Sequence, residues 1–505
     1  MPARVLFIGF DGLDSKLLGE WAEAGILPTF RALLQRSTFG PTKNPPGLYG
    51  GAVWPSFNTG LSPGRNGYFY PRQVPRGEYM DADFLPAQQK GTAFWENLSR
   101  AGRRVAVLDL PDAPLVAPLN GIQVVNWSTH DSTNDTCRAF PAGIIADLEN
   151  RFGRPAPDHC DRDVQIIGHK ALLNSLRARV KNKIDISLHY LAQENWDFFA
   201  TCFSEAHCIG HQSWHLHDPA HPRHDAALAA EIGDPLKTIY QMFDDALARL
   251  LDAAGRDAVT VVLASHGMGP LYRDESIVFD EILQRLHADP GSRAGGRFRL
   301  LKRAWYALPP TLRASAPFKQ LKARLLPRLR QSMLAPGRAA RRFFAIQYSP
   351  HAGAIRINVI GREKSGLVQR GDEYRRVCEE LRRELLALVN AGSGKPVVKE
   401  VHIMADVYSG PCVDDLPDIV ALWRREEEVR EIHSPRIGRV KVPELNWRSG
   451  DHRDRGLFIG HGAPFHPMRL SQPVSVTDIA PTLAGLVGVR LEDADGRPII
   501  GPMGL

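Results

Sequence analysis

The sequence predicts an α/β protein whose central sheet is mostly parallel and flanked by helices. Apolar, β-branched runs alternate along the 505-residue chain with longer segments whose apolar residues recur at i, i+3 and i+4. The apolar runs are nearly continuous, which is typical of parallel strands buried on both faces. Several runs end in Asp, Ser or His, and in open α/β sheets functional groups gather at the carboxyl ends of strands.

Strands are expected where an apolar run ends at a polar or turn residue. The first is RVLFIGFD, which begins at Arg4. The others are expected over Arg103–Pro111, Trp196–Glu205, Ala258–Gly267, Gly353–Ile360, Pro417–Trp423 and Arg455–Gly462. Helices are expected over Leu13–Leu34, Asp234–Gly255 and Glu373–Gly392, of which the last two end at glycine, a common helix terminator.

The composition is that of an ordinary globular protein. With 43% hydrophobic and 24% charged residues, the chain can bury a large core, which argues against disorder. The six cysteines form no CxxC pair, so neither a zinc ribbon nor a redox motif is indicated. No apolar stretch reaches 18 residues, and we find no internal repeat. We therefore expect one domain over residues 1–505 in a soluble, reduced, cytoplasmic protein.

The positive net charge comes from one segment. Residues 293–342 contain 14 Lys and Arg and no Asp or Glu, whereas the whole chain carries +7, so the rest of the chain is net negative. Leu, Phe and Trp are interleaved with these cations, which predicts short amphipathic helices. We expect a basic helical insertion over residues 290–345. It is a solvated insertion packed on the body, a surface that binds anionic lipid headgroups, or a lid that covers an anionic ligand. Nucleic acid is the weaker partner because the rest of the chain is acidic.

Side chains of metal-ligand type stand at several predicted strand ends. Asp11 ends the first strand, and the strand that begins at Trp196 runs into a segment with His207 and His211. Four residues apart on a helix, these two imidazoles share a face and can bind one ion. His266 follows a third strand, and His452 precedes a fourth. The sequence therefore predicts a metal site at this edge of the sheet.

Eight segments occur in an order and spacing that carry a family resemblance. They are FIGFDGL, VWPSFNTGLSPGRNGYF, SEAHCIGHQSWHLHDP, ASHGMGP, RINVIGREKSGLVQRGDEY, LPDIVALW, SGDHRDRGLFIGHG and SVTDIAPTLAGLVGV. Together they resemble the alkaline phosphatase superfamily, in particular its type I phosphodiesterase/nucleotide pyrophosphatase and phosphohydrolase/phosphomutase branch. The resemblance implies an alkaline-phosphatase-like sandwich with insertions, two zinc-type ions and a Thr or Ser nucleophile.

Carried over residue by residue, the family pattern fits some positions and fails at others. The resemblance implies that Asp11, His211, His266 and His452 are metal ligands. His207 stands where the family has an aspartate.

The nucleophile position and one further ligand position also depart from the pattern. Ser265 replaces the aspartate of the family's Ser-Asp-His-Gly motif, and the nucleophile position, nine residues before Thr59, is Gly50. If the alignment slips, Tyr49, Ser56 or Thr42 could supply a hydroxyl, although Ser56 is expected to face away from a metal. Glu205 is expected either to orient a ligand histidine or to serve as a carboxylate at a helix N-terminus.

These departures lead to a specific hypothesis. His207, His211 and His452 would hold one zinc ion with an open position, and metal-activated water would hydrolyse phosphodiesters or phosphomonoesters. Asp11 and His266 would position substrate or move protons. Two ions, or another divalent metal, stay open. The alternative is a catalytically degenerate member that binds a metal, a ligand or a membrane.

The substrate is expected to be anionic. Arg65 and Arg453 lie in the motif segments and could each pair with a phosphoryl oxygen. A lid over residues 293–342 would favour a large or lipid-linked phosphoester, and the protein would then lie peripherally on the inner face of the membrane.

Overall fold

The computed structural model describes residues 3–128, 136–153, 168–287, 335–444 and 448–499, and these form two compact units. The first unit comprises residues up to Tyr68, Leu85–Leu271 and the C-terminal part of the chain from residue 448. The second comprises Phe69–Phe84 and the described residues from Tyr272 to 444. The single domain over residues 1–505 stays a prediction. Most of the predicted basic insertion at 290–345 lies outside the described residues, which resume at residue 335.

The first unit is built on a ten-stranded sheet, counted over the described residues, in the order β20-β2-β19-β9-β1-β8-β5-β6-β7, with β21 beside β2. Its strands are β1 (Arg4–Phe10), β2 (Thr38–Lys43), β5 (Val105–Leu108), β6 (Gly121–Val125), β7 (Arg138–Phe140), β8 (Phe198–Phe203), β9 (Ala258–Ala264), β19 (Leu457–His461), β20 (Met468–Arg469) and β21 (Val474–Ser475). The central strands from β9 to β6 are parallel, while β19 and β7 pair antiparallel with their neighbours. The predicted, mostly parallel α/β sheet is confirmed.

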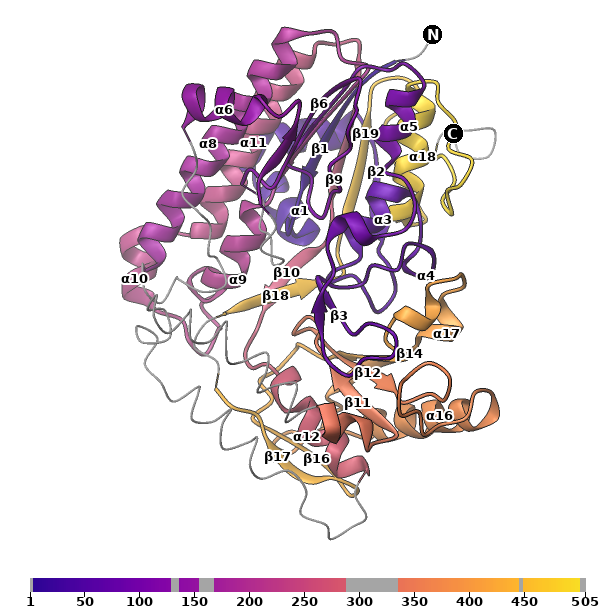
Figure 1. Cartoon of the computed structure of the whole chain (residues 1–505). Coiled ribbons are helices and arrows are strands. Elements are labelled where there is room, and N and C mark those ends of the chain that lie inside the picture. Colours follow the sequence, from indigo (N-terminus) through magenta and orange to yellow (C-terminus); the bar gives the residue numbers. More distant parts are fainter. Residues whose placement is uncertain (1–2, 129–135, 154–167, 288–334, 445–447, 500–505) are drawn as a thin grey trace. The chain divides into compact units, whose positions relative to one another are not determined.

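Helices cover both faces of this sheet (Figure 1). One layer contains α1 (Ser15–Glu23), α2 (Pro28–Gln35), α6 (Ile144–Phe152), α8 (His169–Gln193), α9 (Glu205–His217), α10 (Ala226–Ile232) and α11 (Pro235–Ala254); the other contains α3 (Val53–Thr59), α5 (Phe94–Arg100) and α18 (Val476–Leu486). Between the sheet and α11, Phe10, Phe203 and Phe243 form a fully buried aromatic cluster. The short α4 (Pro63–Asn66) follows α3.

The helix predicted over Leu13–Leu34 is wrong as a single element. The chain instead forms α1 and α2, with a turn between Glu23 and Pro28. Pro28 lacks a backbone N–H and is favoured at the first position of a helix, so it starts a new helix and does not continue the first. The apolar periodicity hid the break because both short helices pack their apolar sides on the same core.

The second unit contains two of the predicted strands, but in an antiparallel sheet. This sheet has the order β11-β12-β15-β14, in which β12 (Ala352–Ile357) and β15 (Ile419–Trp423) are central. The unit's other elements are β3 (Arg72–Gln73), β4 (Ala82–Asp83), α12 (Ser276–His287), β11 (Phe343–Ile346), α16 (Asp372–Leu386), β13 (Val389–Asn390), β14 (Val398–Ile403), α17 (Met404–Val407), β16 (Glu431–Ser434) and β17 (Gly438–Lys441). A separate apolar core joins α12 and α16 to the sheet.

No helix within the described ranges combines the length and apolar character needed to cross a membrane.

Candidate active site

The candidate site lies at the carboxyl edge of the central parallel strands. Asp11 directly follows β1, Ser265 and His266 follow β9, and Glu205 follows β8 after one residue. Because β9, β1 and β8 are neighbours and parallel, these ends meet at one edge. The backbone N–H of Asp11 donates to Phe203 O (2.8 Å), and that of Ser265 donates to Phe10 O (3.2 Å). The hydrogen bonds between the strands therefore continue as far as Asp11 and Ser265.

Helix α9 brings two histidines to this edge. His207 and His211 are buried and lie one helical turn apart in its first half. The backbone N–H of His207 donates to Asp11 O at 3.1 Å. This close approach needs Gly12, which has φ +71°, because a Cβ there would lie 2.5 Å from the Cα of His207.

A two-stranded antiparallel sheet, whose strands lie far apart in the sequence, supplies the third histidine. Strand β10 (Gly267–Pro270) pairs antiparallel with β18 (Gly450–Arg453), and Met268 lies opposite His452 in the register. The first residue of β18, Gly450, packs closely against the backbone of α9, because a Cβ on Gly450 would lie 2.1 Å from Gly210 O. Contact between the strand and the helix thus depends on a residue without a side chain.

The three imidazoles converge on one point. The Nε2 atom of His452 lies 2.9 Å from that of His207 and 3.1 Å from that of His211, and the last two are 3.2 Å apart. Three nitrogens bound to a tetrahedral zinc at 2.0–2.1 Å would be about 3.3 Å apart, so the triangle is close to that of a zinc site. The Nδ1–H of His211 donates to Gly450 O (2.9 Å), which leaves its Nε2 with the lone pair. The residues fit a metal ion of zinc type.

Asp11 and His266 lie beside this triad. Oδ1 of Asp11 is 3.5 Å from Nε2 of His266, and it accepts hydrogen bonds from Trp54 Nε1 (2.9 Å) and Ser265 Oγ (2.7 Å). The rings of His266 and His452 have centroids 4.2 Å apart. Asp11, His207 and His266 form a second group whose ligand-type atoms all lie within 4.8 Å of one another.

His207 belongs to both groups, which favours one ion over two. A neutral imidazole has one nitrogen lone pair, so His207 cannot serve both groups at once. Without it the second group keeps one carboxylate and one imidazole, since Ser265 provides a hydroxyl that already donates to Asp11. A dication requires more than this to offset its charge and the loss of its hydration.

Burial and neighbouring groups determine the protonation states of Asp11 and His266. Burial opposes ionisation of Asp11, but His207, His266 and the hydrogen bonds from Trp54 and Ser265 outweigh it and lower its pKa. Burial, aided by His207, lowers the pKa of His266 against the opposing effect of Asp11. At neutral pH the pair is therefore a carboxylate next to a neutral imidazole.

The comparisons with known proteins show the family to which the chain belongs. A model of the type I phosphodiesterase/nucleotide pyrophosphatase family matches residues 5–440. The chain belongs to this family. Because the family consists of phosphoester hydrolases, the chain is an enzyme of that class.

The solved structures of one enzyme show the same fold at low sequence identity, and a second protein matches with a lower TM-score. Phosphonoacetate hydrolase from Sinorhizobium meliloti 1021, solved with phosphonoformate and with phosphonoacetate, matches with a TM-score of 0.52, 15% identity and 96% of each chain covered. Human ectonucleotide pyrophosphatase/phosphodiesterase 5 matches with a TM-score of 0.47 and 12% identity, over 98% of this chain and 97% of that one. No curated protein matches the chain significantly.

The structure places the hydroxyl candidates near α3. Gly50 and Tyr49 lie in the turn before this helix, and Tyr49 is buried. Trp54 points at Asp11, whereas Ser56, two residues later, lies about 200° around the helix and therefore faces away. Thr42 is buried in β2 with its hydroxyl over Gly456. Any catalytic role for these hydroxyls stays a prediction.

The two arginines predicted to bind substrate both interact with other groups of the protein. Arg65 forms ion pairs with Asp493 and Asp495. Arg453 donates to the carbonyls of His452 (2.9 Å) and Pro270. Their role in substrate binding stays a prediction.

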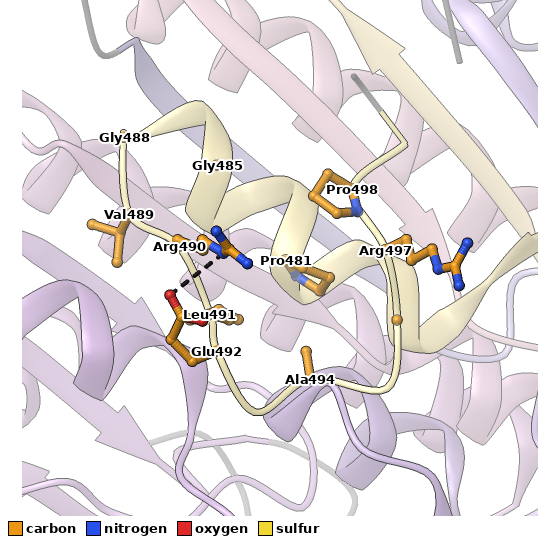
Figure 2. Close-up of a pocket in the computed structure, with 11 residues that line it drawn as sticks. Pro481, Gly485, Gly488, Val489, Arg490, Leu491, Glu492, Ala494, Arg497 and Pro498 are labelled. Atoms are coloured by element: carbon orange, nitrogen blue, oxygen red, sulfur yellow. Dashed lines mark ion pairs between the residues drawn. The ribbon is translucent and has the colours of Figure 1, made fainter. Parts of the chain in front are cut away.

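A hollow of about 520 Å³ lies elsewhere in the first unit. It is formed by the end of α18 and the loop after it, and Figure 2 shows Arg490 and Glu492 paired across part of it. None of the histidines of the candidate site lines this hollow.

Sequence reasoning missed the residues that support the site. Trp54, Gly450 and the buried cations Arg179 and Lys183 of α8 were not recognised. The four-residue spacing of Arg179 and Lys183 shows only that both lie on one helix face, and such a face is usually solvent-exposed. Glu205 forms no hydrogen bond to a ligand histidine; it lies with these cations instead.

Proposed function

We propose that the chain is a metal-dependent hydrolase of small anionic phosphate-type esters, with one zinc-type dication held by His207, His211 and His452. The observation that carries the proposal is the convergence of three buried Nε2 atoms within 3.2 Å of one another. Imidazole ligands suit zinc and other late transition metals better than magnesium or calcium, which prefer oxygen. An ion of this type would supply Lewis acidity, which favours ionisation of water near neutral pH and stabilises charge on a phosphoryl oxygen.

Water is proposed as the attacking group, because Gly50 offers no hydroxyl at the family's nucleophile position. His266 and Asp11 would then accept and stabilise the proton that the water loses. His266 can accept a proton at Nε2, since its Nδ1 faces Gly267 O at 3.3 Å. The Asp11 carboxylate, 3.5 Å from this Nε2, stabilises the charge that forms. Trp54 and Ser265 fix the carboxylate in this position.

The substrate class follows from the family and the charges of the site. A phosphodiester or phosphomonoester of small size is proposed, with Arg453, next to His452, as the arginine closest in sequence to the metal ligands. A lipid-linked substrate, a membrane surface and a cytoplasmic location rest on composition and on residues 293–342, most of which lie outside the described residues; they stay predictions.

Metal content and turnover, measured together, test the proposal. Elemental analysis of the purified wild type should give about one zinc per chain, and the His452→Ala variant should give none. Turnover of bis(p-nitrophenyl) phosphate and p-nitrophenyl phosphate should fall with the metal. His461→Ala, a histidine of β19 that bonds to Ser37 away from the triad, is the matched control and should keep both. Two ions per chain would contradict the one-ion site, and no metal would overturn the proposal.

A further inference from the structure

Four charged side chains are buried together below α9. Arg179 and Lys183 of α8, Glu205 of α9 and Asp109 after β5 are each at most 4% exposed. Oε1 of Glu205 lies 3.4 Å from Arg179 Nη2 and 3.4 Å from Lys183 Nζ, and Lys183 Nζ is 3.2 Å from Asp109 Oδ2. Two cations and two carboxylates balance, which buried charges require.

Glu205 depends on the two cations alone. Among the described residues, neither of its carboxylate oxygens has a hydrogen-bond partner apart from these ion pairs. Glu205 also lies in the first turn of α9, where the helix dipole stabilises a negative charge. Removing one cation would therefore leave two buried carboxylates with a single counter-charge.

The same cations hold the backbone from which α9 starts. Lys183 donates to Cys202 O (3.1 Å) and Ser204 Oγ (3.4 Å), at the end of β8. Arg179 donates to Ser128 O and contacts Cys208 Sγ at 3.9 Å. Strand β8 and the first turn of α9 are thus both tied to α8.

The helical segment that carries two triad histidines is held at both ends. Its start is the Glu205 cluster, and its end is Ser213, which has non-helical φ −123° and ψ 17°. There Ser449 closes the segment: its N–H donates to His211 O (2.8 Å) and its Oγ to Gln212 O (3.1 Å). His207 and His211 lie between these two fixed points.

We propose that Glu205, clamped by Arg179 and Lys183, is a positioning residue that fixes where α9 begins and thereby where His207 and His211 meet His452. The inference rests on the proposed metal-dependent function. Glu205 does not touch the metal or the substrate; it acts through the helix.

The experiment compares wild type, Glu205→Gln, Lys183→Met and the double variant. Each is titrated with Zn²⁺ against a chelator, and with Co²⁺ to record the visible spectrum of the histidine site. Both single variants should bind about ten- to a hundredfold more weakly, the usual effect of removing groups that orient metal ligands. In the double variant the buried charges balance again. Its melting temperature should recover towards wild type, while its metal affinity stays low because the tie to α8 is gone.

Glu363→Gln is the matched control. Glu363 of the second unit is also buried and pairs with Arg356 and Arg362, both at 2.8 Å. This variant should lower the melting temperature and leave zinc affinity and the cobalt spectrum unchanged. Wild-type affinity and spectrum in Glu205→Gln would overturn the inference, as would an equal loss of affinity in Glu363→Gln or full recovery of affinity in the double variant.

A second measurement separates this inference from the proposed function. Imidazole ¹H–¹⁵N NMR of the metal-free protein should show shifts of the His207 and His211 resonances in Glu205→Gln but not in Glu363→Gln. If wild type binds no zinc, the proposed function fails, while the NMR comparison still decides whether Glu205 positions the two rings. Unchanged histidine resonances in Glu205→Gln would refute the positioning role.

Discussion

The Nδ1 atom of His211 lies 2.9 Å from the carbonyl oxygen of Gly450, a residue 239 positions later in the chain. This hydrogen bond fixes the tautomer of His211, so that its Nε2 presents a lone pair to the centre of the triad. It also ties α9 to β18, the strand that carries His452. The separation of His211 and His452 therefore depends on how closely α9 and β18 pack.

The substitution Gly450→Ala should disrupt this contact. The added Cβ would lie 2.1 Å from Gly210 O, so β18 has to move away from α9 and His452 moves with it. We expect a loss of zinc affinity of about ten- to a hundredfold, measured by competition with a chelator.

A glycine in open space provides the control for Gly450→Ala. Gly19 lies within α1, and a Cβ there meets nothing within 4 Å. Gly19→Ala should keep wild-type zinc affinity and raise the free energy of unfolding by about 0.5–1 kcal/mol, through helix propensity. Wild-type affinity in Gly450→Ala would show that the triad does not depend on this close approach.

Ser265→Asp should change the number of ions bound. Ser265 is fully buried and its hydroxyl donates to Asp11 Oδ1, in a group that also contains His266. A second carboxylate there would offset the charge of another dication. The zinc content measured by elemental analysis should rise from about one ion per chain to about two. Ser265→Asn introduces a side chain of the same size as Asp but without its charge, so this variant should still bind about one zinc per chain. A rise in zinc content in both variants would refute the electrostatic explanation.

His215 should make the protein less stable in acid. Burial, together with His169, Arg223, His221 and His224, lowers the pKa of His215 to about 3. The unfolded chain, with an ordinary pKa near 6.5, therefore binds a proton between about pH 6.5 and 3 that the folded protein does not. The free energy of unfolding should fall as the pH drops through this window, by at most about 1.4 kcal/mol per pH unit from this group.

Urea unfolding of His215→Asn between pH 7 and 4 tests this contribution. The variant should be less stable than wild type at pH 7, because the Nδ1 contact to Ser449 Oγ (2.8 Å) is lost, and the difference should shrink as the pH falls. Parallel curves for wild type and His215→Asn would contradict the assignment.

The two motif arginines should behave differently in kinetics. Arg65 already has two carboxylate partners, so Arg65→Ala should leave KM for p-nitrophenyl phosphate within about twofold. Its partly exposed ion pairs are worth only about 0.2–1 kcal/mol of stability. Arg453→Ala should raise KM about ten- to a hundredfold, since a hydrogen bond to a charged group is worth about 1.5–3 kcal/mol. A larger KM change for Arg65→Ala than for Arg453→Ala would reverse the assignment.

Local sequence determined the main strands and the candidate ligands. Buried parallel strands have continuous apolar runs, so β1, β5, β8, β9 and β19 could be located to within a few residues. Asp11 and His266 could be placed at one edge because the carboxyl ends of parallel strands meet there. His452 reaches the same edge because the strand that follows it, β19, runs antiparallel to β9. The break between α1 and α2 was missed, because a periodic apolar pattern continues across a turn when both helices pack on one core.

Tertiary structure alone decided how the site is held. Arg179 and Lys183 resemble solvated helix residues in the sequence, and only the packing of α8 under α9 buries them against Glu205. Likewise, Gly450 is needed because a helix carbonyl from 240 residues earlier occupies the space of its side chain. The local sequence shows which side chains a segment carries. The partner of a buried charge, and the space available for a side chain at a glycine position, depend on segments that are distant in the chain.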